Sequence, residues 1–300
     1  MTGTTTSTAM TVIQLIEHSA DRLEQAHVGY GHGTTNAFDE AAWLVMWRLG
    51  LPIDDLDAAA DQAVSPQQAE QVRQLIEERI TTRKPAAYLT RQAWLQGVPF
   101  YVDERAIVPR SFIAELLAEG TIDDWLSDKT QRVLDLCTGN GSLAVLAAMA
   151  YPEVTVDGAD ISPDALAVAR INVDQHELAD RITLLQSNGL QSVQGPYDLI
   201  LCNPPYVNAQ SMKALPAEYR AEPELALASG EDGMDFTRQL IADLRAQPDR
   251  YMTPDAVLVL EIGNEREHFE RAFPELPVFW LPTSSGDDQV LLITREALLA

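Results

Sequence analysis

The chain has 300 residues, a length that allows one large domain or a core domain plus a smaller one. Hydrophobic residues make up 46% and charged residues 22%, which is typical of a folded globular protein and excludes a collagenous or wholly disordered one. Acidic residues outnumber basic ones by 45 to 21, for a formal net charge of −24. Such a chain is a poor platform for nucleic-acid phosphates, which bind clustered Lys and Arg. The acidic surplus indicates either a solubilising or salt-adapted surface or attraction to a basic partner protein.

Cysteine and apolar patterns disfavour a secreted or a membrane-spanning protein. Cys137 and Cys202 lack the spacing of a disulfide framework or a zinc ribbon. Residues 1–10 are rich in Thr and contain no basic or apolar part of a signal peptide, and no apolar run approaches the length of a membrane span. The five His residues show no paired ligand spacing, so no metal site is expected. We therefore expect a cytoplasmic protein with a flexible tail over residues 1–10.

Apolar residues recur at helical spacing over three stretches near the N-terminus. These stretches are Val12 to Leu23, Phe38 to Leu49 and Ser65 to Ile80. We therefore expect a small helical domain over residues 11–87. The next stretch, residues 88–102, holds two apolar and aromatic runs around Gly97, which predict a β-hairpin. We assign residues 88–110 to a hairpin linker between two domains.

The pattern over residues 111–300 alternates between strands and helices and predicts an α/β domain with a doubly wound parallel sheet. The expected strands are residues 132–137, 154–161, 182–186, 197–202, 256–262, 278–281 and 289–294. The expected helices are residues 112–117, 142–151, 163–176 and 265–273, the third capped by Ser162.

A glycine turn joins the first of these strands directly to a helix and reads Asp135-Leu-Cys137-Thr-Gly139-Asn-Gly141. Glycines at such a turn let a ligand lie against bare backbone at a helix N-terminus. The pattern also fits a dinucleotide fingerprint, so by itself it indicates either a nucleotide-like cofactor or a purely structural turn. Asp160, which ends the second strand, is suited either to accept both ribose hydroxyls or to share in capping the next helix.

The most specific motif, Asn203-Pro204-Pro205-Tyr206, directly follows an apolar strand. Two consecutive prolines stiffen the loop and remove two backbone donors. What remains is a fixed pair of acceptors, the Asn203 side-chain oxygen and the Pro204 carbonyl, beside an aromatic ring. This pair matches the planar NH2 group of a glutamine amide, adenine or cytosine. A rigid strand-to-loop turn is the structural alternative.

The glycine turn and Asn-Pro-Pro-Tyr, in this order, resemble the HemK/PrmB family of protein glutamine N5-methyltransferases, and the similarity extends over residues 11–295. Further similar segments are Arg83 to Tyr88, Phe100 to Ser111, Asp160 to Leu166 and Glu218 to Gly233. The resemblance implies a Rossmann-like, seven-stranded core that uses S-adenosylmethionine, preceded by a helical substrate-recognition domain and a hairpin. Pro109-Arg110-Ser111 and Cys137 look like the branch that acts on large-subunit ribosomal protein three.

The resemblance also implies roles for single residues. Those expected at the cofactor are Asp135, Cys137, Gly139, Gly141, Asp160, Ile161, Asn188, Gly189 and Asn203. The expected catalytic residues are Asn203, Pro204 and Tyr206, and those expected at the substrate are Asn203, Pro204, Pro205, Tyr206 and Arg110. Asn188 stands where the family usually has an acid near the adenine. Because an Asn oxygen can still accept the adenine amino hydrogen, we expect weakened cofactor binding rather than none.

The implied activity is methylation of a glutamine side chain in that ribosomal protein, a basic partner, with no role for a membrane and no nucleic acid as direct substrate. Two other reactions stay open: glutamine methylation of peptide-chain release factors, and N6-adenine methylation of nucleic acid. An inactive cofactor-binding module that helps ribosome assembly is a third alternative, from a different class.

Overall fold

The computed structural model describes residues 10–300, so the expected tail lies outside the described residues except for Met10. The chain forms two compact units. Unit 1 contains the described residues up to Arg91 together with Pro216–Ala221, and unit 2 contains Gln92–Leu215 and Glu222–Ala300. Over residues 10–300, no helix combines the length and the apolar character needed to cross a bilayer.

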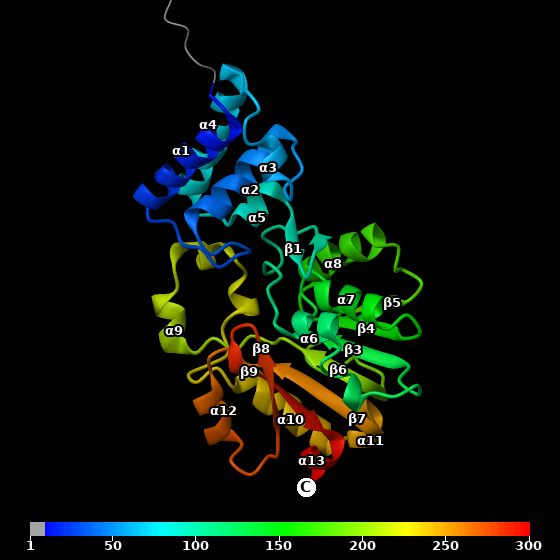
Figure 1. Cartoon of the computed structure of the whole chain (residues 1–300). Helices are drawn as coiled ribbons and strands as arrows, with labels where there is room; N and C mark the ends of the chain where they lie inside the picture. The colour runs from blue at the N-terminus through cyan, green and yellow to red at the C-terminus, as the bar shows by residue number, and fades with distance from the viewer. Residues whose placement is uncertain (1–9) are drawn as a thin grey trace, which may run out of the picture. The chain divides into compact units, whose positions relative to one another are not determined.

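Unit 1 is helical, and α1 packs beside α2 and α4 in it (Figure 1). Its helices are α1 (Val12–Gln25), α2 (Ala37–Leu49), α3 (Leu56–Ala59), α4 (Pro66–Thr82) and α5 (Ala86–Thr90), with a 3-10 turn over Ala217–Ala221. Thr11 and Ser65 begin α1 and α4 with capping boxes, which satisfy backbone N–H groups that a helix start leaves unpaired. The three predicted helical stretches are confirmed, whereas the short α3 and α5 were not predicted.

The start of the predicted hairpin was wrong. Tyr88 and Thr90 belong to α5, where the Thr90 hydroxyl donates to the Ala86 carbonyl oxygen at 2.9 Å. Both residues favour strands by local propensity, and their burial in unit 1 overrides it. The hairpin itself is confirmed, as β1 (Ala93–Leu95) and β2 (Val98–Phe100) pair antiparallel around Gln96 and Gly97, which both have positive φ.

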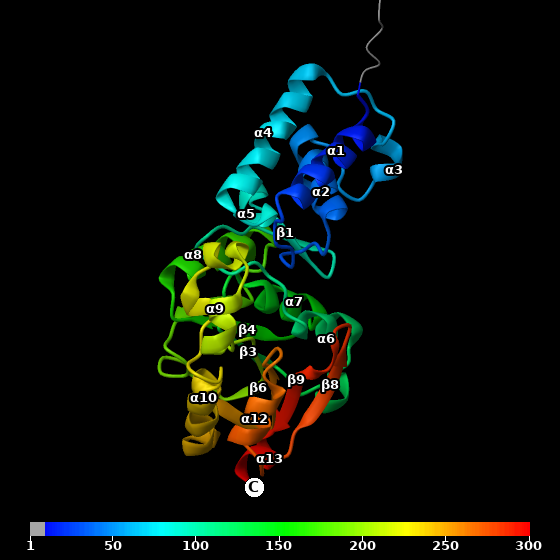
Figure 2. The same cartoon turned by 90° about the vertical axis from the view of Figure 1, so that its left-hand side faces the viewer.

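Unit 2 contains a seven-stranded sheet in the order β5-β4-β3-β6-β7-β9-β8, which confirms the expected Rossmann-like core. The strands are β3 (Arg132–Leu136), β4 (Thr155–Asp160), β5 (Ile182–Gln186), β6 (Tyr197–Cys202), β7 (Met252–Glu261), β8 (Phe279–Thr283) and β9 (Gly286–Thr294). The predicted parallel pairing holds for β3 to β7 but was wrong for β9, which runs antiparallel to both β7 and β8 at the edge shown in Figure 2. Only two residues join β8 to β9, too few for a parallel crossover.

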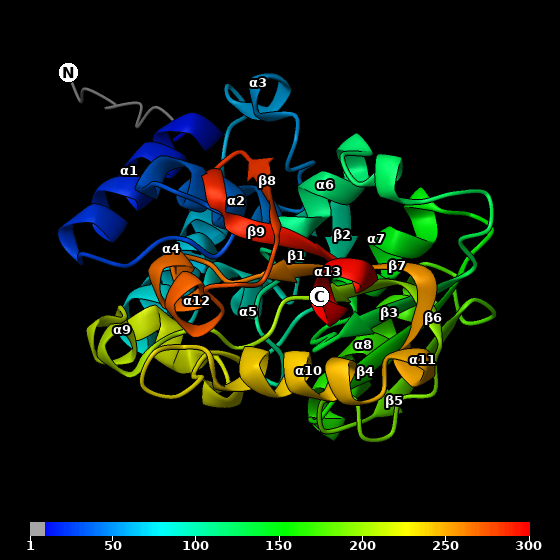
Figure 3. The same ribbon diagram turned by 90° about the horizontal axis from the view of Figure 1, so that it is seen from below.

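Helices cover both faces of this sheet, with α6 and α7 on one side and α10 on the other (Figure 3). The helices are α6 (Ile113–Glu119), α7 (Ser142–Ala150), α8 (Pro163–Gln175), α9 (Ala209–Ala214), α10 (Asp235–Ala246), α11 (Pro248–Tyr251), α12 (Arg266–Ala272) and α13 (Arg295–Leu299), with 3-10 turns over Asp123–Trp125 and Glu224–Ala226. The four expected helices of this unit are confirmed. Helix α10 was not predicted, although its Leu240, Ile241 and Leu244 are buried against the sheet.

Strand register brings the candidate residues to one edge. Leu136 of β3 pairs with Ala159 of β4 on one side and with Cys202 of β6 on the other. Asp160 in turn pairs with Gln186 of β5. Because β3 to β6 are parallel, the segments that follow them all leave the sheet at its carboxyl edge, where ligands bind in open α/β sheets.

Candidate active site

The glycine turn between β3 and α7 depends on three left-handed backbone positions. Cys137, Gly139 and Gly141 have φ values of 63°, 55° and 82°. At Gly139 a Cβ would lie 3.6 Å from the nearest atom, a methyl of Ile107, so the protein leaves this backbone accessible. At Gly141 a Cβ would lie 3.0 Å from that of Ala169, so this glycine allows α8 to pack against the turn. The two glycines, alike in sequence, therefore differ in what they do.

Asp135 is fully buried under this turn. Its Oδ2 accepts hydrogen bonds from the Thr138 hydroxyl and from the Ala144 backbone N–H at 2.9 Å, which ties the end of β3 to α7. Its Oδ1 is buried and has no hydrogen-bond partner among the described residues, and the same is true of the Asn140 side-chain nitrogen. Burial raises the pKa of Asp135 to about 7. Unpaired buried polar atoms are costly, so the turn carries unsatisfied capacity for hydrogen bonding.

Asp160 links the turn to the end of β4. Its Oδ2 accepts from the Gly139 N–H and its Oδ1 from the Ser162 N–H, both at 2.9 Å. Ser162, not Asp160, caps α8, since its hydroxyl accepts from the Ala165 N–H. Burial raises the pKa of Asp160. Next to it the side chain of Ile161 is 41% exposed, which offers an apolar surface at the same edge.

The segment after β5 completes this side of the site. The Ser187 N–H donates to the Asp160 carbonyl oxygen at 2.9 Å, so the segment is fixed to the end of β4. Asn188 is exposed, and a Cβ on Gly189 would meet no atom within 4 Å. The predicted Asn188 and Gly189 therefore stand on the open side of the turn.

Cys137 and Cys202 occupy neighbouring strand ends and are both free thiols. A hydrogen bond with Cys202, together with burial, raises the pKa of the Cys137 thiol above its ordinary value. A thiol with a raised pKa is mostly uncharged at neutral pH and is a poor nucleophile. We therefore assign the two cysteines a packing role, since both belong to one hydrophobic cluster between the glycine turn and the segment after β6.

Asn203-Pro204-Pro205-Tyr206 follows β6 directly and belongs to neither a helix nor a strand. Pro204 is buried, while the other three residues are partly exposed. Over residues 10–300 no hydrogen bond engages the side-chain amide of Asn203. The far end of the segment is fixed, because the Val207 N–H donates to the Leu227 carbonyl oxygen at 2.8 Å. A rigid, partly exposed acceptor thus borders the glycine turn.

Arg110 is bound by a carboxylate of unit 2. Its two terminal nitrogens donate to the two oxygens of Glu222 at 2.6 and 2.8 Å, and the Glu222 side chain is wholly buried. Glu222 also accepts from the Val108 N–H at 2.9 Å. The fork geometry of Arg suits such a paired bond. Arg110 therefore shapes its own loop, and direct contact with a substrate stays a prediction.

Two residues of this edge, Glu261 and Gly263, were not predicted from the sequence. Glu261 ends β7 and accepts from the hydroxyl of Tyr206 at 3.2 Å. A Cβ on Gly263 would lie 2.5 Å from a ring carbon of Tyr206, so only glycine allows the ring this close. One signal was available in the sequence: an acid at the end of an otherwise apolar strand, a residue type almost never buried without a partner.

These residues fit the nucleoside cofactor that the glycine turn predicts. The unpartnered Oδ1 of Asp135 and side-chain nitrogen of Asn140 offer an acceptor and a donor. Gly139 and Gly189 leave backbone open to a ligand, and Ile161 offers an apolar surface for a flat ring.

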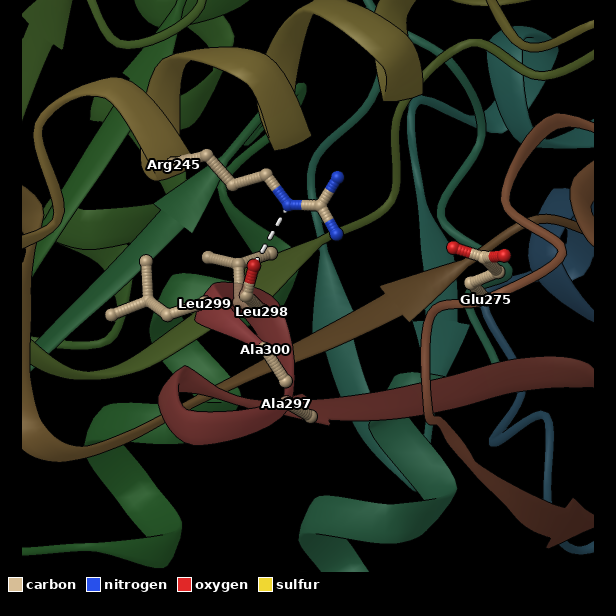
Figure 4. Close-up of a pocket in the computed structure, with 6 residues that line it drawn as sticks. All are labelled: Arg245, Glu275, Ala297, Leu298, Leu299 and Ala300. Carbon is tan, nitrogen blue, oxygen red and sulfur yellow. Dashed lines mark hydrogen bonds between the residues drawn. The ribbon is translucent and has the colours of Figure 1, made fainter.

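A cavity of about 490 Å³ lies elsewhere in unit 2, at the C-terminus of the chain (Figure 4). Its lining residues are Arg245, Glu275, Ala297, Leu298, Leu299 and Ala300. The Arg245 Nε donates to the Leu298 carbonyl oxygen at 2.7 Å, the bond dashed in Figure 4. Because Thr294 pairs with Val257, α13 extends towards the amino ends of the parallel strands. This cavity is therefore separate from the candidate site.

Comparison of the sequence with known families gives two matches. Residues 14–90 match the PrmC N-terminal domain, and residues 114–220 match the methyltransferase small domain. Three curated relatives share one name, ribosomal protein uL3 glutamine methyltransferase. That of Bordetella pertussis is 53% identical and covers 96% of each chain. That of Burkholderia pseudomallei is 50% identical over 97% of this chain and 96% of its own, and that of Neisseria meningitidis serogroup B is 46% identical over 96% and 94%.

Among solved structures, the catalytic domain of hMettl16 in complex with the MAT2A 3'UTR hairpin 6 superposes with a TM-score of 0.51. The two chains are 14% identical, and the match covers 77% of this chain and 83% of that one. At this identity the likeness concerns the fold alone, and it agrees with the Rossmann-like methyltransferase core described above.

Proposed function

The chain belongs to the family of ribosomal protein uL3 glutamine methyltransferases, and from that premise we propose that it methylates the side-chain amide nitrogen (N5) of a glutamine in ribosomal protein uL3. The observation that carries the proposal is the pairing of β3 with β6, since it sets Asn203 and Pro204 beside the glycine turn. A rigid acceptor pair next to a nucleoside site suits transfer of a group from a cofactor to an NH2 group.

S-adenosylmethionine would supply a methyl group bonded to a positively charged sulfur. Asp160 would bind the ribose hydroxyls, and Asp135 with Cys137, Gly139 and Gly141 would flank the methionine part. Ile161, Asn188 and Gly189 would lie along the adenine, with Asn203 at the border to the substrate.

The chemical problem for the protein is the amide nitrogen, whose lone pair is delocalised into its carbonyl group. In the proposed arrangement the Asn203 side-chain oxygen and the Pro204 carbonyl each accept one amide hydrogen. These two bonds would orient the lone pair of the nitrogen towards the methyl group to be transferred. Both bonds strengthen as positive charge develops on that nitrogen, so they stabilise the transition state more than the bound substrate. Positioning of this kind can supply about 7 kcal/mol or more.

Pro205 and Tyr206 complete the proposed substrate side. Pro205 stiffens the segment, and the Tyr206 ring gives a flat surface for the planar amide. Arg110 would act at the substrate as well, through the loop that it forms with Glu222.

The proposed partner is chosen by charge as well as by family. A net charge of −24 attracts a basic ribosomal protein and repels nucleic acid, so we propose uL3 itself, before rRNA covers it, as the substrate. The reaction then takes place in the cytoplasm, where ribosomal subunits assemble. Neither a membrane nor a nucleic acid is a direct partner in this proposal.

The test offers purified uL3 and purified release factor separately, each with methyl-labelled S-adenosylmethionine, and maps the product by mass spectrometry. We expect one methylated glutamine in uL3 and little label in the release factor. Faster labelling of the release factor, or label on a residue other than glutamine, would overturn the proposal.

A further inference from the structure

Tyr206 is held on three sides by groups of unit 2. Its hydroxyl donates to Glu261 Oε1 at 3.2 Å, and its ring lies against the bare backbone of Gly263. Its carbonyl oxygen lies where a Cβ on Gly233 would stand. A side chain at either glycine would displace Tyr206, so the two glycines and Glu261 define one position for it.

Glu261 also holds a second element of the site. Its Oε2 accepts from the Ser111 hydroxyl at 2.6 Å and from the Phe112 backbone N–H at 2.9 Å. Glu261 is 1% exposed and stands one residue beyond Leu260, which pairs with Cys202 of β6. A single buried carboxylate therefore joins the last residue of Asn-Pro-Pro-Tyr to the loop that contains Arg110.

We propose, building on the function above, that Glu261 is a positioning residue for methyl transfer. It acts through Tyr206 and Ser111 and touches neither substrate nor cofactor. Pro205 connects Tyr206 rigidly to the Pro204 carbonyl, so the orientation of the tyrosine governs where that acceptor points. A displacement of about 1 Å at an oriented group can cost about a hundredfold in rate.

The local chemistry makes Glu261→Gln a selective probe. The Ser111 hydroxyl and the Phe112 N–H both donate to one oxygen, so a glutamine keeps its single acceptor oxygen there and turns its NH2 group, which cannot accept, to the Tyr206 hydroxyl. The glutamine side chain has nearly the same size and shape as the glutamate that it replaces. The variant should therefore keep the strand and the loop at Ser111 and loosen the tyrosine.

Asp198 provides a matched control. It also accepts three hydrogen bonds, from the N–H groups of Gln131 and Arg132 and from the Thr253 hydroxyl, at 2.8 to 2.9 Å. It lies near the amino end of β6, at the opposite edge of the sheet. Asp198→Asn should lower thermal stability and leave the rate of methylation unchanged.

The kinetic experiment measures kcat with uL3 and the Kd for S-adenosylmethionine. We expect Glu261→Gln to lower kcat about tenfold or more and to change the Kd less than about twofold. Combined with Tyr206→Phe, it should cost no more than the larger single effect, because both changes break the same bond. Additive losses in the double variant, or an unchanged kcat in Glu261→Gln, would overturn the proposal.

A second readout needs no substrate. In protein labelled with 13C-glycine, the α-hydrogens of Gly263 report the adjacent ring by NMR, and Tyr206→Leu gives their shift without it. We expect Glu261→Gln to move the signal towards the Tyr206→Leu position and Asp198→Asn to leave it in place. An unmoved signal in Glu261→Gln overturns the positioning role. If the wild type fails to methylate uL3, the proposed function is wrong, and this signal alone decides the role of Glu261.

Discussion

Arg79 and Glu218 stand 139 positions apart in the sequence and form a buried ion pair in unit 1, with 3.3 Å between Nη1 and Oε1. The Arg79 Nε also donates to Glu40 at 2.7 Å, and its Nη2 donates to the Gly29 carbonyl oxygen at 2.8 Å. The Arg79 side chain is 0% exposed and those of both glutamates are 2% exposed. Glu218 also accepts from Arg83 at 3.2 Å, so two arginines compensate the buried Glu40 and Glu218 and tie Pro216–Ala221 into the helical unit.

We predict that Arg79→Ala lowers the free energy of unfolding by about 3–5 kcal/mol, because it leaves the buried carboxylate of Glu40 without its cationic partner and removes one of the two arginines that pair with Glu218. Arg22→Ala is the control, since the Arg22–Glu77 pair is 49% exposed on both sides and should contribute less than about 1 kcal/mol. Urea unfolding of both variants measures the difference. Equal losses would mean that the buried network adds nothing beyond an exposed pair.

A second prediction separates backbone strain from cofactor contact. Gly139→Ala and Gly50→Ala both place a side chain at positive φ, 55° and 69°, and neither meets a nearby protein atom closer than 3.6 Å. Each should cost about 1 kcal/mol of stability. Only Gly139→Ala should also weaken S-adenosylmethionine binding, by about tenfold or more, as measured by calorimetry. Similar cofactor affinity in the two variants would remove Gly139 from the binding site.

Much of this fold could be predicted because strand and helix periods are local properties of the sequence. The antiparallel direction of β9 was not predicted, because an apolar strand pattern has no direction. Only the short β8–β9 connection sets the direction of this strand. Helix α5 was missed for a related reason: Tyr88 and Thr90 have strand propensity, and their burial in unit 1, which the sequence does not display, decides otherwise.

The same limit applies to the site. Asn203 to Tyr206 and the glycine turn were found because each is a contiguous motif with a clear chemical reading. Glu261 was missed because its partners, Ser111 and Tyr206, lie 150 and 55 positions away, and only folding brings the three together. Arg110 was predicted to bind substrate, and its paired bond to Glu222, at a separation of 112 positions, was equally invisible in the sequence.

The third prediction concerns pH. Burial raises the pKa of Asp135 from its ordinary value of 3.8 to about 7, so the folded state binds more protons than the unfolded state between these values. The contribution of Asp135 to the free energy of unfolding is therefore fully present below pH 3.8 and is lost as the pH rises towards 7. In the cofactor-free protein, Asp135→Asn should therefore flatten the fall in unfolding free energy over that range, by up to about 1.4 kcal/mol per pH unit. Parallel curves for wild type and variant would contradict a buried, protonated Asp135.

The fourth prediction separates chemistry from binding. Asn203→Ala should lower turnover about a hundredfold or more, because one oriented acceptor is lost from the transition state, and should leave S-adenosylmethionine affinity nearly intact. Asn203→Asp keeps an acceptor oxygen of the same reach and should retain more activity than the alanine variant. Turnover with uL3 and calorimetry with the cofactor measure both effects. A fully active Asn203→Ala would exclude the acceptor-pair mechanism.

The last prediction concerns how uL3 is captured. If the net charge of −24 steers a basic partner, kcat/KM for uL3 should fall markedly between low salt and about 0.15 M, where the screening length is about 8 Å. The Kd for S-adenosylmethionine, measured over the same salt series, should change much less, because that ligand is held by contacts within one site. Steering acts on association, so stopped-flow binding should place the salt effect in the association rate. If kcat/KM stays constant over this range, the acidic surface serves solubility or salt adaptation, and uL3 is recognised by short-range contacts instead.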